Sequence, residues 1–95
     1  MSDNQFPADA TIIDVRTPEE FAQERVKKAI NIDLFSPSFM LELQKLDQSK
    51  SYLLYCRSGN RSGQAEQIMR QIGFLKVQNI GGLAEVRDLF GTEFP

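Results

Sequence analysis

Short apolar runs alternate along the chain with longer segments whose apolar residues recur at helical spacing. Four runs predict strands, because they are rich in β-branched or aromatic residues and end at polar or turn-forming residues. These runs are residues 11–15, 29–32, 52–55 and 77–80. The run 52–55 is apolar without alternation, which is typical of a strand covered on both faces.

A capping pattern predicts the first helix. Thr17 suits an N-cap, Pro18 the first helical position and Glu20 the third position of a capping box. We expect a short helix through about Gln23, with Phe21 facing inward.

Three later helices are predicted from apolar spacing. The apolar positions are Phe39, Met40, Leu43 and Leu46, then Ala65, Ile68, Met69 and Ile72, and finally Leu83, Val86, Leu89 and Phe90. Before the first of these helices, Ser36 and Pro37 repeat the cap-then-proline signal. Gly73 is expected to end the second as a C-cap glycine.

The resulting order of strands and helices predicts an α/β fold. Strict alternation favours a mostly parallel sheet with helices on both faces, and ligands then bind beyond the carboxyl ends of the strands. A chain of 95 residues suits one domain, 1–95, in which residues 1–10 form a polar lead-in.

Composition excludes several mechanisms and partners. One cysteine and no histidine rule out a Ser-His-Asp triad, a Cys-His dyad, an internal disulfide and a zinc site built on thiolates. We therefore expect no metal and no cofactor. A net charge of -2 argues against nucleic acid as a partner, and no apolar stretch is long enough to cross a membrane.

The first residues are polar and include an acid, so we expect no secretory signal in this chain. The expected location is the cytoplasm. A processed or trimmed chain would look the same and would place the protein in the periplasm.

The segment from Cys56 to Gly63 concentrates the candidate chemistry. Cys56 follows the third predicted strand, a helix begins within a few residues, and Arg57 and Arg61 flank the loop. A helix N-terminus and nearby cations favour thiolate over thiol, so we expect a lowered Cys56 pKa. Between these arginines lie small or turn-tolerant residues that can fold their amides around an anion: Ser58, Gly59 and Asn60.

Simpler interpretations stand beside this one. From position alone, a single cysteine at a strand end is more often a small buried hydrophobic residue. Arg61 could pair with an acid such as Asp14 or Glu20 and pin the loop, or it could contact substrate, and the sequence leaves both open. Asp14, after the first strand, is interpreted as structural support rather than as part of the crevice.

The run Cys56-Arg57-Ser58-Gly59-Asn60-Arg61-Ser62 resembles the active-site loop of rhodanese domains, which are sulfurtransferases. Four other segments are similar to further parts of that family: residues 13–21, 29–32, 73–74 and 79–83. The resemblance covers about residues 11–86. It is strongest to small single-domain members of the phage-shock-protein-E type.

This resemblance implies a three-layer rhodanese-like fold with a sheet of four to five strands. It implies that Cys56 takes a sulfane sulfur from thiosulfate or a similar donor and holds it as a persulfide. Cyanide or a cellular thiol would then accept the sulfur. The residues implied to cradle the persulfide and bind the anionic donor are Arg57, Ser58, Gly59, Asn60, Arg61 and Ser62. We expect a monomer.

Two segments depart from the family pattern, and two other functions compete. The turn at residues 24–29 lacks the usual histidine, glycines and proline, so a longer or more mobile turn is expected, and Val86 replaces a common tryptophan. One alternative is a sulfur-carrier or partner-binding module without turnover of free substrates. A cysteine phosphatase or arsenate reductase is disfavoured, because only four residues separate Cys56 from Arg61, one fewer than in phosphatase loops.

Overall fold

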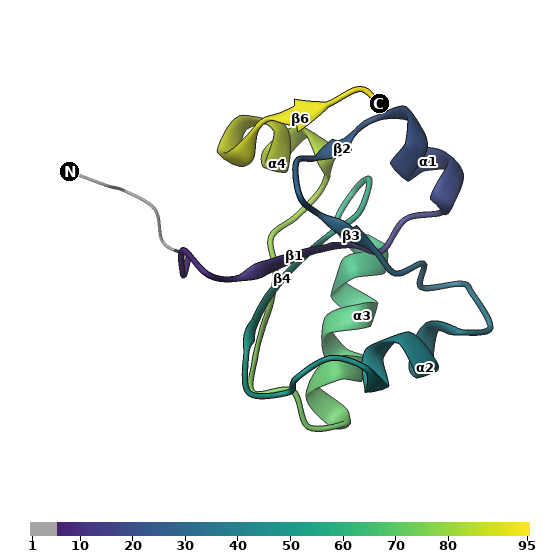
Figure 1. Cartoon of the computed structure of the whole chain (residues 1–95), viewed down its shortest axis with the longest axis vertical. Coiled ribbons are helices and arrows are strands. Elements are labelled where there is room, and N and C mark those ends of the chain that lie inside the picture. The colour runs from purple at the N-terminus through teal and green to yellow at the C-terminus, as the bar shows by residue number, and fades with distance from the viewer. Residues whose placement is uncertain (1–5) are drawn as a thin grey trace.

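Four parallel strands form the central sheet of the computed structural model, which describes residues 6–95 (Figure 1). Across the sheet they lie in the order β3 (Ile30–Asn31), β1 (Thr11–Asp14), β4 (Ser51–Tyr55) and β5 (Lys76–Asn79). Asp14 pairs in register with Tyr55, so both strands end at the same edge. The predicted parallel sheet is confirmed. Residues 1–5 of the predicted lead-in lie outside the described residues.

Helices cover both faces of this sheet, as predicted. Alternate residues of β4 divide the core, because successive side chains of a strand point to opposite faces. Leu54 packs in one cluster with α2 (Phe39–Gln44) and α3 (Asn60–Gln71), and Tyr55 packs in the other with α4 (Leu83–Phe90) (Figure 1). Within residues 6–95, no helix is long and apolar enough to cross a lipid bilayer.

The first helix, α1 (Pro18–Gln23), has the predicted capping box. The Glu20 amide donates to Thr17 Oγ1 at 3.2 Å, and the Thr17 amide donates to Glu20 Oε1 at 3.0 Å. Phe21, predicted to face inward, is only half-buried, and Arg25 covers its ring with the guanidinium carbon 4.7 Å from the centroid. Gly73 follows the end of α3 with φ of 113°, as a C-cap glycine requires.

The prediction for the start of α2 was wrong by two residues. Ser36 and Pro37 form a turn instead, in which Ser36 accepts hydrogen bonds from the amides of Ser38 and Phe39, both at 3.1 Å. α2 is also short, with only Phe39 and Leu43 buried, so Met40 is 41% exposed. Its neighbour in that prediction, Leu46, lies beyond the helix.

The structure also adds a small second sheet that the sequence pattern did not predict. Strand β2 (Arg25–Val26) pairs antiparallel with β6 (Thr92–Glu93) near the C-terminus. Arg25 Nε donates to Glu93 Oε2 at 3.0 Å. The segment that departs from the family pattern is thus joined to the end of the chain, and its Lys28 turns with φ of 67°.

Candidate active site

Cys56 lies directly after β4, at the carboxyl edge of the sheet, with no exposed surface. Its Sγ accepts hydrogen bonds from the Gly59 amide at 3.0 Å and from the amide and hydroxyl of Ser62, both at 3.4 Å. Gly59 is the N-cap of α3 and has φ of 94°, a conformation that favours glycine. The chain can therefore turn sharply and direct these donors at the sulfur.

These contacts set the ionisation of the thiol. Burial alone would raise the pKa of Cys56, because it disfavours the charged form. Hydrogen bonds from the Ser62 hydroxyl and from the amides of Ser62, Ser58 and Gly59 outweigh burial and hold the Cys56 pKa below its ordinary value. The amides of the loop and of the helix N-terminus, which the sequence argument invoked, are thus among the groups that lower this pKa. The Ser62 hydroxyl adds to them, and the arginines that the sequence argument also invoked are not among the main causes.

The double glycine after β5 packs against the cysteine loop. The Cys56 amide donates to the Gly81 carbonyl, and the Leu83 amide donates to the Arg57 carbonyl, both at 3.2 Å. A Cβ atom on Gly82 would lie 2.4 Å from the Arg57 carbonyl oxygen. Only glycine allows this approach, so the segment forms a close-fitting wall of the loop.

Arg61 is paired with Glu20 of α1. Its Nη1 and Nη2 donate to Glu20 Oε1 and Oε2 at 2.8 and 3.1 Å. The hydrogen bonds from Arg61, aided by those from Thr17, lower the pKa of Glu20 to about 2. The sequence left Asp14 and Glu20 as possible partners of Arg61, and the structure pairs it with Glu20. The strongly positive loop expected from sequence is thereby partly neutralised by a carboxylate from a distant segment.

Arg57 is the exposed cation of the loop. In the part of the chain that the structure describes, its guanidinium has no ion pair and no hydrogen-bond partner. It lines an open polar pocket of about 310 Å³ between α1, α4 and the C-terminal segment. The pocket is formed by Arg16, Glu20, Gln23, Glu24, Arg57, Leu83, Arg87 and Phe94. An anion entering here would meet an unpaired guanidinium one residue after the cysteine.

Asp14 is fully buried and is held by Arg16. The Arg16 side chain donates to both carboxylate oxygens, at 2.7 Å for the shortest contact, and the Arg16 amide donates to Oδ1 at 2.9 Å. Arg16 also donates to the Glu24 carbonyl oxygen. Sequence reasoning did not single out Arg16, although a charged residue just beyond a buried strand is a usable signal.

Of the remaining loop residues, Ser58 and Asn60 are exposed, and Asn60 begins α3. The structure also brings Asn79, the last residue of β5, to this loop. Its Nδ2 donates to the Gly59 carbonyl at 3.0 Å, and its Oδ1 accepts from the Ser62 hydroxyl at 2.7 Å. Sequence reasoning missed Asn79. The rule that ligands bind beyond strand ends could have drawn attention to it.

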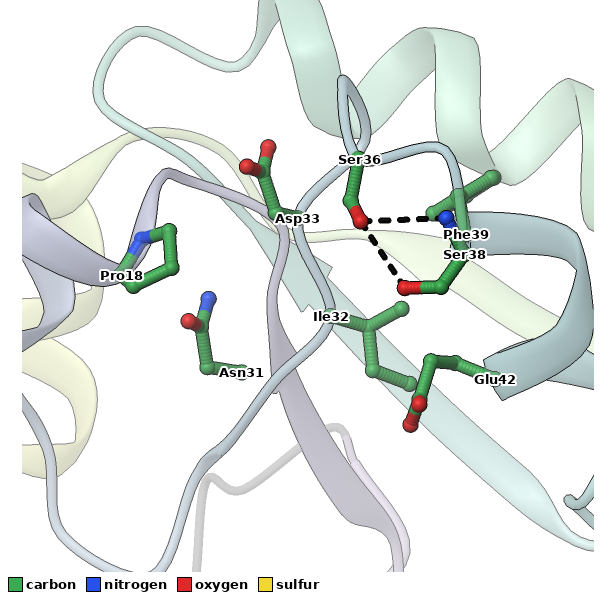
Figure 2. A pocket seen from close by; sticks show the side chains of 8 residues that line it. All are labelled: Pro18, Asn31, Ile32, Asp33, Ser36, Ser38, Phe39 and Glu42. Carbon is green, nitrogen blue, oxygen red and sulfur yellow. Dashed lines mark hydrogen bonds between the residues drawn. The ribbon is translucent and has the colours of Figure 1, made fainter.

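A second hollow, of about 250 Å³, lies at the carboxyl end of β3. Figure 2 shows Asp33 and Glu42 on opposite sides of it, with Ser36 and Ser38 hydrogen-bonded to each other. Its charged groups are both carboxylates, so it does not suit an anionic substrate. Among the described residues, no cluster of three or more histidine, cysteine or acidic side chains could hold a metal.

The family model for the rhodanese-like domain matches residues 1–88. The chain belongs to the rhodanese-like family. The family predicted from the sequence is thus confirmed.

Similar proteins carry sulfurtransferase names. Thiosulfate sulfurtransferase PspE of Escherichia coli K12 is 39% identical over 74 residues, which are 78% of this chain and 71% of that protein. A sulfurtransferase of Allochromatium vinosum is 31% identical over 74 residues, covering 78% of this chain and 67% of that protein. A solved E. coli rhodanese with anions superposes with a TM-score of 0.78 and 34% identity, covering 90% and 99% of the two chains. Family and relatives together support sulfurtransferase activity.

Proposed function

We propose that this rhodanese-like protein transfers a sulfane sulfur from thiosulfate to a thiophilic acceptor through a persulfide on Cys56. The single observation that carries the proposal is the set of hydrogen-bond donors around Sγ, which lowers the Cys56 pKa although the residue is buried. A thiolate is the nucleophilic form of cysteine, and this chain obtains it without histidine.

The reaction balances as two displacements. The Cys56 thiolate attacks the outer sulfur of thiosulfate, a new S–S bond forms, and sulfite leaves with the electron pair of the old S–S bond. Cyanide or a thiolate then attacks the outer sulfur of the persulfide, and Cys56 leaves as thiolate. Covalent catalysis of this kind divides one transfer into two easier steps.

The loop provides a role for each neighbour of Cys56. The amides of Gly59 and Ser62, which now donate to Sγ, stabilise negative charge on the sulfur and later on the persulfide. Arg57 attracts the donor, since its charge is unpaired among residues 6–95 and faces the polar pocket. The similar E. coli rhodanese with anions supports an anionic ligand. Arg61 supports the loop through Glu20. Asp14 acts less directly, by holding Arg16 over the ring of Tyr55, the residue before Cys56.

Intact mass tests the persulfide directly. After incubation with thiosulfate, the wild-type protein should gain the mass of one sulfur atom, and cyanide should remove it and yield thiocyanate. Cys56→Ser should gain nothing. If the wild type also shows no adduct, the proposed function is wrong.

The alternative function, a sulfur carrier without turnover of free substrates, uses the same cysteine. It is supported if the adduct forms but thiocyanate production stops after one turnover. Continued turnover supports the enzyme. The sequence-based expectations of a single monomeric domain and a cytoplasmic location stay predictions. A reducing compartment would suit an enzyme whose only thiol must stay free.

A further inference from the structure

Asn79 is the side chain that joins the two parts of the cysteine loop. Its Nδ2 donates to the Gly59 carbonyl at 3.0 Å, and its Oδ1 accepts from the Ser62 hydroxyl at 2.7 Å. The Gly81 amide donates to the same Oδ1 at 3.0 Å. The amide of Asn79 therefore has a partner at both ends, and its orientation is determined by them.

Gly59 and Ser62 are also the residues whose amides donate to Cys56 Sγ, at 3.0 and 3.4 Å. One side chain from β5 thus contacts both of the residues whose backbone amides donate to the sulfur. Asn79 does not itself contact Sγ among the recorded hydrogen bonds of residues 6–95. It belongs to β5, whereas Gly59 and Ser62 belong to the start of α3.

We propose that Asn79 is a positioning residue that sets the reactivity of Cys56 by holding the Gly59 and Ser62 amides against its sulfur. A hydrogen bond to a charged acceptor weakens steeply as its distance and angle depart from the optimum. The two amides belong to residues that Asn79 contacts from β5, outside the loop itself. Asn79 provides that contact without entering the reaction.

The Ser62 hydroxyl offers a competing explanation with the opposite sign. Ser62 Oγ lies 2.7 Å from Asn79 Oδ1 and 3.4 Å from Cys56 Sγ. The hydroxyl has a single proton, so it cannot donate fully to both acceptors at once. If Asn79 only occupied that proton, removing Asn79 would free the hydroxyl for Sγ and lower the Cys56 pKa. If Asn79 positions the two amides, removing it raises the pKa.

The test is the pH dependence of Cys56 alkylation by iodoacetamide, measured in wild type and Asn79→Ala. We expect the pKa to rise by about one unit in the variant, which makes the thiolate fraction about tenfold smaller below the pKa. Gln78→Ala is the matched control, because Gln78 is an exposed amide on the same strand. The Cys56 pKa in this variant should equal that of wild type. An unchanged or lowered pKa in Asn79→Ala overturns the proposal.

A second variant protects the test against misfolding. Asn79→Leu keeps the approximate size of the side chain and adds no charge beside the sulfur, but it removes the donor to the Gly59 carbonyl and the acceptor for Ser62 and Gly81. If circular dichroism shows that Asn79→Ala does not fold, the same rise in the Cys56 pKa is expected in Asn79→Leu, measured against Gln78→Leu as a control on the same strand. Equal pKa values in these two variants overturn the proposal.

The inference rests on Cys56 being the reacting thiolate of the proposed function, but the two can fail separately. Alkylation requires no thiosulfate, so it reports on Asn79 even if thiosulfate is not the donor. Conversely, a persulfide that forms normally in a protein whose Asn79 variants have an unchanged pKa would leave the proposed function intact and remove the role of Asn79.

Discussion

Arg61 and Glu20, which are 41 positions apart in the sequence, form a two-point ion pair that connects the cysteine loop to α1. Glu20 also accepts the capping hydrogen bond of α1 from the Thr17 amide. One carboxylate therefore completes a helix cap and fixes the loop. As a result, Arg61 is held by an ion pair, and Arg57 is the loop arginine that has none among the described residues.

Replacing Glu20 tests this connection. Glu20→Gln keeps an oxygen for the helix cap but removes the charge that binds Arg61. Both side chains are only partly exposed, so we expect a loss of about 1 kcal/mol in the free energy of unfolding. Urea denaturation measures it, with Glu19→Gln as a control because Glu19 is exposed and outside the pair. Equal losses in the two variants would show that the pair adds nothing.

The same pair predicts a pH dependence of stability. Glu20 has a pKa of about 2 in the folded protein, against an ordinary value of 4.5. A lowered folded-state pKa stabilises the protein above the unfolded value, and this contribution is lost as pH falls from 4.5 towards about 2. As pH falls between these two values, the free energy of unfolding should decrease less in Glu20→Gln than in wild type. Parallel curves would contradict the assignment.

Arg57 is expected to act on the donor and not on the fold. Arg57→Ala should raise the KM for thiosulfate about tenfold, since a hydrogen bond to a charged group contributes about 1.5–3 kcal/mol. The unfolding midpoint should stay at the wild-type value, because the guanidinium has no ion pair within residues 6–95. Lys50→Ala, which removes an exposed cation elsewhere, should leave KM unchanged. A wild-type KM in Arg57→Ala would exclude Arg57 from donor binding.

Gly82 is predicted to be intolerant of a side chain. In Gly82→Ala, the new Cβ would lie 2.4 Å from the Arg57 carbonyl oxygen, so the loop or the double glycine must move. We expect a loss of about 1–3 kcal/mol in stability from this overpacking. The rate of Cys56 alkylation should fall as well, because the loop amides shift. Ala84→Ser, on the exposed side of α4, is the control. Wild-type stability and alkylation in Gly82→Ala would show that the loop adapts freely.

Local patterns predicted much of the fold. The capping box of α1, the glycine that ends α3 and the four parallel strands all follow from residues close together in sequence. Such signals failed where a turn competed with a helix start, as at Ser36. They also gave no sign of β2 and β6, since two-residue strands are too short to show a period.

The candidate site divides along the same line. The sequence by itself singled out Cys56 as the candidate nucleophile, because the cysteine, the glycine and the helix start that surround it lie within a few residues of one another. Only the tertiary structure decided which acid binds Arg61, that Arg57 is left unpaired among the described residues, and that Asn79 holds the loop. These pairings join segments that are distant in the chain. They depend on strand order and helix placement, which no local periodicity contains.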